Sequence, residues 1–166
     1  MSDRTNGLAM EPFPARLEDR IETILGRYPR TGSALVPILQ LIQEDAGFVS
    51  VRAQEQVAAR LRIPAAFVAG VVSFYTMIRD RKIGKYHLQV CGTLSCCLRG
   101  SEPLLDHLKD RLGIREGETS RDGKYTLSTV ECLGSCGTAP VVQINDEYYE
   151  DMSPEKIEGV LEGLKD

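Results

Sequence analysis

Four of the five cysteines in this chain follow two predicted β-strands, and this placement constrains the fold more than any other feature. The segment KYHLQV alternates apolar and polar side chains and leads directly into Cys91, with Cys96 in the loop that follows. The segment KYTLSTVEC is predicted to be a second strand; it ends at Cys132, and Cys136 follows. If the two strands are neighbours, the loops leaving them meet at one edge of the sheet. The sequence therefore predicts that all four thiols converge there.

The spacing of the thiols limits what they can bind. The first pair is C-x4-C and the second is C-x3-C. Structural zinc sites usually use a tighter C-x2-C, although spacings up to four are known. Thioredoxin-type redox sites need C-x2-C, which is absent. C-x4-C opens the motif of plant-type 2Fe-2S ferredoxins, but their following C-x2-C is missing here. Spacing alone favours an iron–sulfur cluster and leaves zinc or a disulfide open.

Composition excludes several classes of protein. Hydrophobic residues make up 42% of the 166 residues, as in an ordinary soluble globular protein. Twenty basic and 24 acidic side chains give a net charge of −4. This balance argues against a nucleic-acid binder, and the sequence contains no stripe of Lys and Arg residues that would indicate one. No apolar run approaches the roughly 20 residues of a membrane span, and no signal-peptide core opens the chain. We expect a cytoplasmic protein, at most peripheral on the cytoplasmic face of the inner membrane through its complex.

The two halves of the chain follow different patterns. We expect a flexible tail over residues 1–14, a small helical bundle over residues 15–80 and a second domain over residues 85–166, which makes an α+β protein. The bundle helices are predicted at residues 14–27, 34–47, 51–62 and 64–75, with Ser33 and Ser50 as caps of the second and third helices and Gly47 ending the second.

Aromatic residues of the first half are predicted to belong to its core. The fourth helix is so apolar that much of its circumference is expected to be buried. The same expectation covers the aromatic side chains Tyr28, Phe48, Phe67, Phe74 and Tyr75.

The second half is predicted to have the order β-α-β-β-β-α. Its first helix is expected to be capped by Ser101 and to end at Gly113, and its last to open at Ser153 and Pro154. Residues 78–84, which are charged and contain a glycine, are the expected linker between the halves.

Four further residues and one peptide bond lie near the predicted site or could contribute to it. Cys97 is expected to be a small buried hydrophobe outside the ligand set. His87 and His107 are expected to be solvated surface residues rather than ligands of a Rieske-type cluster. Arg99 is expected to be solvated rather than a donor to a cluster sulfur. The isomer of the bond between Ala139 and Pro140 is left open.

Four segments carry a family resemblance. VCGTLSCCLRG and VECLGSCGTAPVVQIND, together with GVVSFYTMI and DMSPEKIEGVLEGLK, resemble the thioredoxin-like 2Fe-2S subunit of NADH–quinone oxidoreductase (respiratory complex I). Close relatives of that family serve NAD-linked hydrogenases and formate dehydrogenases. The resemblance implies a thioredoxin-like second domain and one 2Fe-2S cluster held by Cys91, Cys96, Cys132 and Cys136. It also implies a neighbouring flavoprotein subunit that carries FMN and the NADH site.

The resemblance predicts an electron-transfer subunit of an NADH:quinone oxidoreductase, surrounded by further iron–sulfur subunits. The chain contains no G-x-G-x-x-G after a strand and no P-loop, so we expect no nucleotide binding, no catalytic residue and no substrate turnover by this chain alone. The alternatives are the equivalent subunit of a soluble NAD-linked hydrogenase or formate dehydrogenase, a zinc-stapled interaction module, and a thiol–disulfide oxidoreductase.

Overall fold

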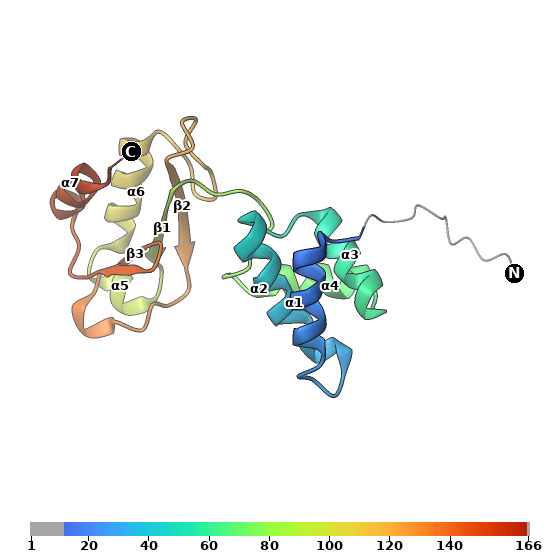
Figure 1. Ribbon diagram of the computed structural model, residues 1–166. Coiled ribbons are helices and arrows are strands. Elements are labelled where there is room, and N and C mark those ends of the chain that lie inside the picture. Colours follow the sequence, from blue (N-terminus) through green and yellow to red (C-terminus); the bar gives the residue numbers. More distant parts are fainter. Residues whose placement is uncertain (1–11, 166) are drawn as a thin grey trace, which may run out of the picture. The chain divides into compact units, whose positions relative to one another are not determined.

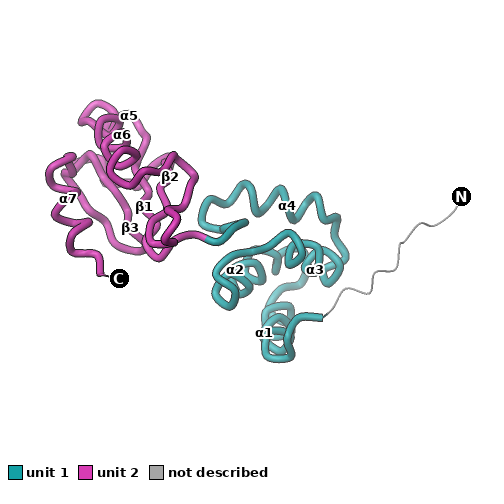
Figure 2. Tube along the Cα trace, turned by 90° about the horizontal axis from the view of Figure 1, so that it is seen from above, with its two compact units in different colours: residues 1–82 teal, residues 83–166 magenta. Residues whose placement is uncertain are grey.

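The computed structural model describes residues 12–165, which form two compact units with a boundary between residues 82 and 83 (Figure 2). Each unit has its own hydrophobic core. Most of the expected tail, residues 1–11, lies outside the described residues. Phe13, which belongs to the expected tail of residues 1–14, is buried in the core of the first unit. Within residues 12–165 no helix has the length and apolar character to span a membrane.

The described part of the first unit, residues 12–82, contains four α-helices (Figure 1). Their inward faces carry apolar side chains, and the most deeply buried of these include Ile21, Ile38, Leu39, Val57 and Val68. The helical part of the fold prediction is therefore confirmed. The helices are α1 (Ala15–Leu25), α2 (Leu35–Ala46), α3 (Val51–Leu61) and α4 (Ala65–Phe74).

Two of the three predicted helix signals in this unit are confirmed. The Ser50 hydroxyl accepts a hydrogen bond from the Ala53 backbone N–H (3.1 Å) and so caps α3. Gly47 ends α2 in the left-handed conformation (φ 84°). Ser33 does not cap α2, because it lies inside a 3₁₀ turn, Thr31–Ala34, that leads directly into the helix.

The prediction that α4 is buried around much of its circumference is wrong. Only Val68 and Val72 of this helix are buried. Phe67 is 56% exposed and Phe74 is 76% exposed. A helix that is apolar on all sides gives no periodic signal, so its sequence could not reveal that one stripe faces the core and the rest faces outward.

The core prediction also fails for three other aromatic residues. Tyr28 and Tyr75 are exposed, and Phe48 is half-buried. The core of the bundle consists almost entirely of aliphatic side chains, and Phe13 is its aromatic member among the buried residues of the described chain.

The connection between the units is shorter than the expected linker of residues 78–84, because each end of that segment packs or hydrogen-bonds within one of the two units. Ile78 is buried in the core of the first unit. The backbone N–H of Gly84 donates to the Thr126 hydroxyl of the second unit (2.7 Å).

Over residues 83–165 the second unit is built on a four-stranded sheet with the order β2-β1-β3-β4. Strand β1 (Tyr86–Cys91) pairs in parallel with β2 (Tyr125–Val130) and antiparallel with β3 (Val142–Ile144), which in turn pairs antiparallel with β4 (Glu147–Tyr149). The helices are α5 (Leu94–Leu98), α6 (Ser101–Leu112) and α7 (Pro154–Gly163). The predicted order is confirmed, with α5 as an additional element.

Helices α6 and α7 pack side by side against one face of this sheet (Figure 1). In β1 the alternating side chains Leu88 and Val90 enter this core, where they meet Leu104 of α6 and Ile157 of α7. The α+β fold class is therefore confirmed for the described chain.

The start of α6 differs from the prediction. Its N-cap is Gly100 in a left-handed conformation (φ 101°), and Ser101 is already the first helical residue. The Ser101 side chain is buried and donates to the Cys97 sulfur (3.7 Å) instead of capping the helix. The predicted end at Gly113 and the Ser153 cap of α7 are confirmed.

Gly84 provides a test of this packing. A Cβ atom there would lie 2.9 Å from the backbone of Lys124 and Tyr125, which cannot move without displacing β2. We expect Gly84→Ala to lower the free energy of unfolding by about 1–3 kcal/mol, as overpacking does. Gly159→Ala, in α7, meets open space and should be neutral or stabilising. Urea denaturation of both variants measures this; equal stability would contradict the close approach.

Candidate metal centre

Parallel pairing of β1 with β2 brings the two cysteine loops together. Cys91 is aligned with Val130 at the carboxyl ends of the two strands. One residue further, the Gly92 backbone N–H donates to the Val130 carbonyl (2.8 Å). Both chain segments then leave the sheet at the same edge, and Cys132 follows Val130 by two residues in the sequence.

The first cysteine pair is buried between the loops. Cys91 and Cys96 are each 2% exposed and pack against Ala139 and Val141, with Leu133 beside them. All three partners lie between β2 and β3, whereas Cys91 is the last residue of β1 and Cys96 lies on α5. Cys91 and Cys96 therefore lie at the junction with the second loop, as the strand placement predicts.

The second pair lies nearer the surface. Cys132 and Cys136 are both exposed. The Gly134 N–H donates to the Cys132 sulfur (3.3 Å), and Gly134 has a left-handed backbone conformation (φ 77°) that favours glycine. A backbone donor to a sulfur stabilises its negative charge, as it would in a thiolate ligand.

Burial and hydrogen bonds together set the acidity of the two inner thiols. The pKa of Cys96 is raised to about 11, chiefly by burial and also by neighbouring Cys91 and Cys136, while a backbone hydrogen bond from Val141 acts in the opposite direction. Burial also raises the pKa of Cys91, but hydrogen bonds outweigh it, chiefly from the Thr93 hydroxyl (3.1 Å), and the net pKa is lowered. Metal binding must therefore displace a proton that Cys96 holds tightly.

The donor set fits a binuclear cluster by its chemistry. Two irons with two thiolates each require four soft sulfur ligands, and the C-x4-C and C-x3-C pairs together offer four thiols. Among residues 12–165 no group of three or more Cys, His, Asp or Glu side chains converges closely enough to bind a single metal ion.

Cys97 differs from its predicted character. It is half-buried, its thiol donates to the Gly92 carbonyl (3.1 Å), and it accepts from Ser101. Its partners are therefore polar groups on either side of α5, the Gly92 backbone and the first residue of α6. The sequence around Cys96 and Cys97 contains no pattern from which these contacts of Cys97 could have been predicted.

The two histidines make specific contacts rather than being simply solvated. His87 Nε2 lies 2.8 Å from the Ser128 hydroxyl, and His107 Nε2 lies 2.8 Å from the Glu158 carboxylate. Both rings are part-buried.

Sequence reasoning also missed the role of Arg99. Its Nε donates to the Ala139 carbonyl (3.4 Å), and its Nη2 lies 3.6 Å from the Asp151 carboxylate. The bond between Ala139 and Pro140, whose isomer the sequence left open, is cis. Thr93, beside Cys91, was likewise missed, although a hydroxyl two residues after a candidate ligand is a recognisable signal.

Comparison with known proteins places the chain in a family. The model of the thioredoxin-like [2Fe-2S] ferredoxin family matches residues 21–165, so the chain belongs to this family. The E subunit of NADH-quinone oxidoreductase from Rickettsia bellii is 45% identical over 147 residues, 87% of this chain and 88% of the relative. An E subunit of NADH-quinone oxidoreductase from Rhizobium meliloti is 42% identical over 149 residues, 90% and 89% of the two chains.

A solved structure shares the fold. The NAD⁺-reducing [NiFe]-hydrogenase in its air-oxidized state matches with a TM-score of 0.65 at 19% identity, over 77% of this chain. This chain spans only 22% of that longer hydrogenase chain. The predicted family and its 2Fe-2S cofactor are confirmed by the family match.

Thiol alkylation of the cluster-free protein tests the described geometry. Burial and a raised pKa should make Cys96 the slowest of the four thiols to react with iodoacetamide at a mildly alkaline pH, whereas exposed Cys132 and Cys136 should react first. Peptide mass spectrometry over time measures the order. Labelling of Cys96 as fast as Cys132 would contradict its burial.

Proposed function

We propose that this chain is an electron-transfer subunit that carries one 2Fe-2S cluster within an NADH:quinone oxidoreductase. The observation that carries the proposal is the meeting of two cysteine loops at one edge of the sheet, beside the parallel β1–β2 pair. The relatives from Rickettsia bellii and Rhizobium meliloti, at 45% and 42% identity, favour this complex over a soluble hydrogenase or a formate dehydrogenase.

We assign the cluster to Cys91, Cys96, Cys132 and Cys136. When bound, a 2Fe-2S cluster gives and takes single electrons. The buried first pair keeps water from one side of the site, and the exposed second pair leaves the other side open to a partner. The chain's own contribution is position, backbone hydrogen bonds and local polarity.

We assign the NADH and FMN sites to a neighbouring flavoprotein subunit, with further iron–sulfur subunits beyond it. The described chain supports this with an exposed apolar group, Phe67 and Phe74 on α4 and Met77 just after it, which are 56%, 76% and 79% exposed. Clusters of exposed large apolar side chains mark interaction sites. The proposal includes a cytoplasmic location, attachment to the membrane only through the complex, no nucleic-acid partner and no substrate turnover by this chain alone.

Serine substitutions test the ligand assignment. Serine offers a hard, far less acidic oxygen, so Cys91→Ser, Cys96→Ser, Cys132→Ser and Cys136→Ser should each lose the cluster or hold it labile. Cys97→Ser should retain it, because the serine hydroxyl can still donate to the Gly92 carbonyl. Iron and acid-labile sulfide per chain measure the outcome. Loss in Cys97→Ser with retention in Cys96→Ser would shift the ligand register by one residue.

Substitution on α4 tests the partner assignment. Phe67→Ser combined with Phe74→Ser removes exposed apolar contact area and should weaken binding to the co-expressed flavoprotein subunit by about tenfold or more. Val51→Ser, at a similarly exposed apolar site at the start of α3, is the control. Affinity capture measures binding, and the double variant and the Val51→Ser control should both keep their cluster. Equal binding by the double variant and the control would place the partner elsewhere.

A further inference from the structure

The segment after β4 runs alongside the second cysteine loop. The Asp151 backbone N–H donates to the Thr138 carbonyl (2.6 Å), and the Met152 N–H donates to the Pro140 carbonyl (3.0 Å). These two backbone bonds bring residues 150–152 to the loop that carries Cys132 and Cys136. We call residues 150–152 the strap.

Glu150, the first residue of the strap, contacts the peptide between the two ligands. Its carboxylate accepts a hydrogen bond from the Ser135 hydroxyl, and Ser135 directly precedes Cys136. The Ser135 and Thr138 hydroxyls lie 2.9 Å apart. Hydrogen bonds from Ser135 and then Thr138 lower the pKa of Glu150, so the carboxylate is charged at neutral pH.

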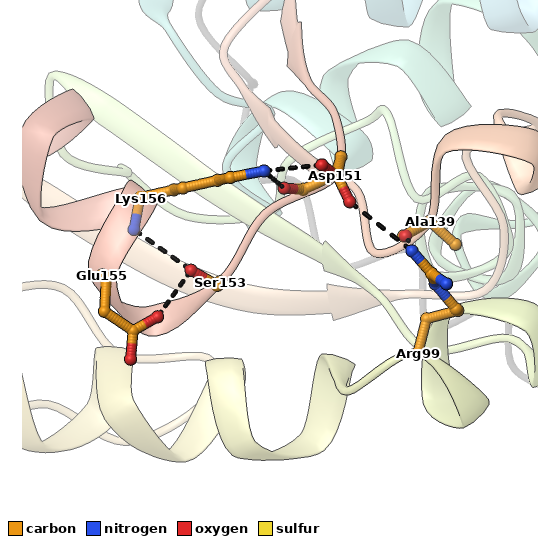
Figure 3. A network of polar contacts seen from close by, with 6 residues as sticks. All are labelled: Arg99, Ala139, Asp151, Ser153, Glu155 and Lys156. Atoms are coloured by element: carbon orange, nitrogen blue, oxygen red, sulfur yellow. Dashed lines mark hydrogen bonds and ion pairs between the residues drawn. The ribbon is translucent and has the colours of Figure 1, made fainter.

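Asp151, the second residue of the strap, joins the two cysteine loops (Figure 3). It lies 3.6 Å from Arg99, which follows the first ligand pair and donates to Ala139 of the second loop. Lys156 of α7 pairs with the same carboxylate at 2.5 Å. Asp151 therefore has two cationic neighbours, whereas the side-chain partners of Glu150 within residues 12–165 are hydroxyl groups.

The uncompensated charge of Glu150 has a consequence for electron uptake. Reduction adds a negative charge to the cluster, and a fixed negative charge nearby opposes it through Coulomb repulsion. A charge at the protein surface acts over a distance set by salt screening, about 10 Å at ~0.1 M. Charge and hydrogen bonding near a cluster are established determinants of its reduction potential.

We propose that Glu150 is a positioning residue of the cluster: through Ser135 it fixes the Cys132–Cys136 loop, and its negative charge keeps the reduction potential low. This inference rests on the cluster assignment made above. Glu150 would act in two ways that can be separated. The hydrogen bond to Ser135 needs only an acceptor, whereas the effect on the potential needs the charge.

Three variants of the full chain, purified without oxygen, separate these effects. Glu150→Gln keeps an amide oxygen as acceptor and removes the charge. Glu150→Ala removes both. Glu116→Gln makes the same charge change at an exposed site on the connection from α6 to β2, outside the cysteine loops. The midpoint potential is measured by redox titration followed by electron paramagnetic resonance, at low and at high salt, and iron release to a chelator is followed separately.

We expect Glu150→Gln to retain full iron and sulfide and to shift the potential upward, with a smaller shift at high salt, while Glu116→Gln matches the wild type. Glu150→Ala should release iron to the chelator several-fold faster than Glu150→Gln. A potential in Glu150→Gln equal to that of Glu116→Gln, in a protein with an intact cluster, would overturn this inference alone. A wild-type chain without iron and sulfide would overturn the proposed function as well.

Discussion

The parallel pairing of β1 with β2 is the constraint on which the candidate centre depends. Parallel strands end at the same edge of a sheet, so two segments distant in the sequence deliver their loops to one place. An antiparallel pair would have put Cys91 and Cys132 at opposite ends. Helices α6 and α7 stabilise this arrangement by covering one face of the sheet with aliphatic side chains. The geometry of the thiols is thus a property of the whole second unit.

Around that edge the two loops are held by different means. The first loop is anchored by burial, since Cys91 and Cys96 pack among Val141 and Ala139. The second loop is exposed and is held by polar contacts to the strap and to Arg99. The centre is therefore buried at its first cysteine pair and exposed at its second.

The sequence predicted what depends on local patterns and missed what depends on tertiary contacts. Strand alternation located Cys91 and Cys132 at strand ends, and the Ser50 cap and the Gly47 stop follow from backbone chemistry within a few residues. Exposure of the aromatic side chains on α4 could not be predicted, because this helix is apolar on every side. The contacts of Arg99 and of the strap were also missed, since their partners are far away in the sequence and surface charges carry no periodic signal.

Redox stoichiometry tests the central claim, that both loops serve one binuclear cluster, most directly. Chain purified without oxygen should contain iron and acid-labile sulfide in equal amounts, two of each per chain, and should take up a single electron from dithionite as its colour bleaches. Colourless protein with one zinc per chain and no electron uptake would contradict this claim, as would a cluster that survives the loss of either cysteine loop.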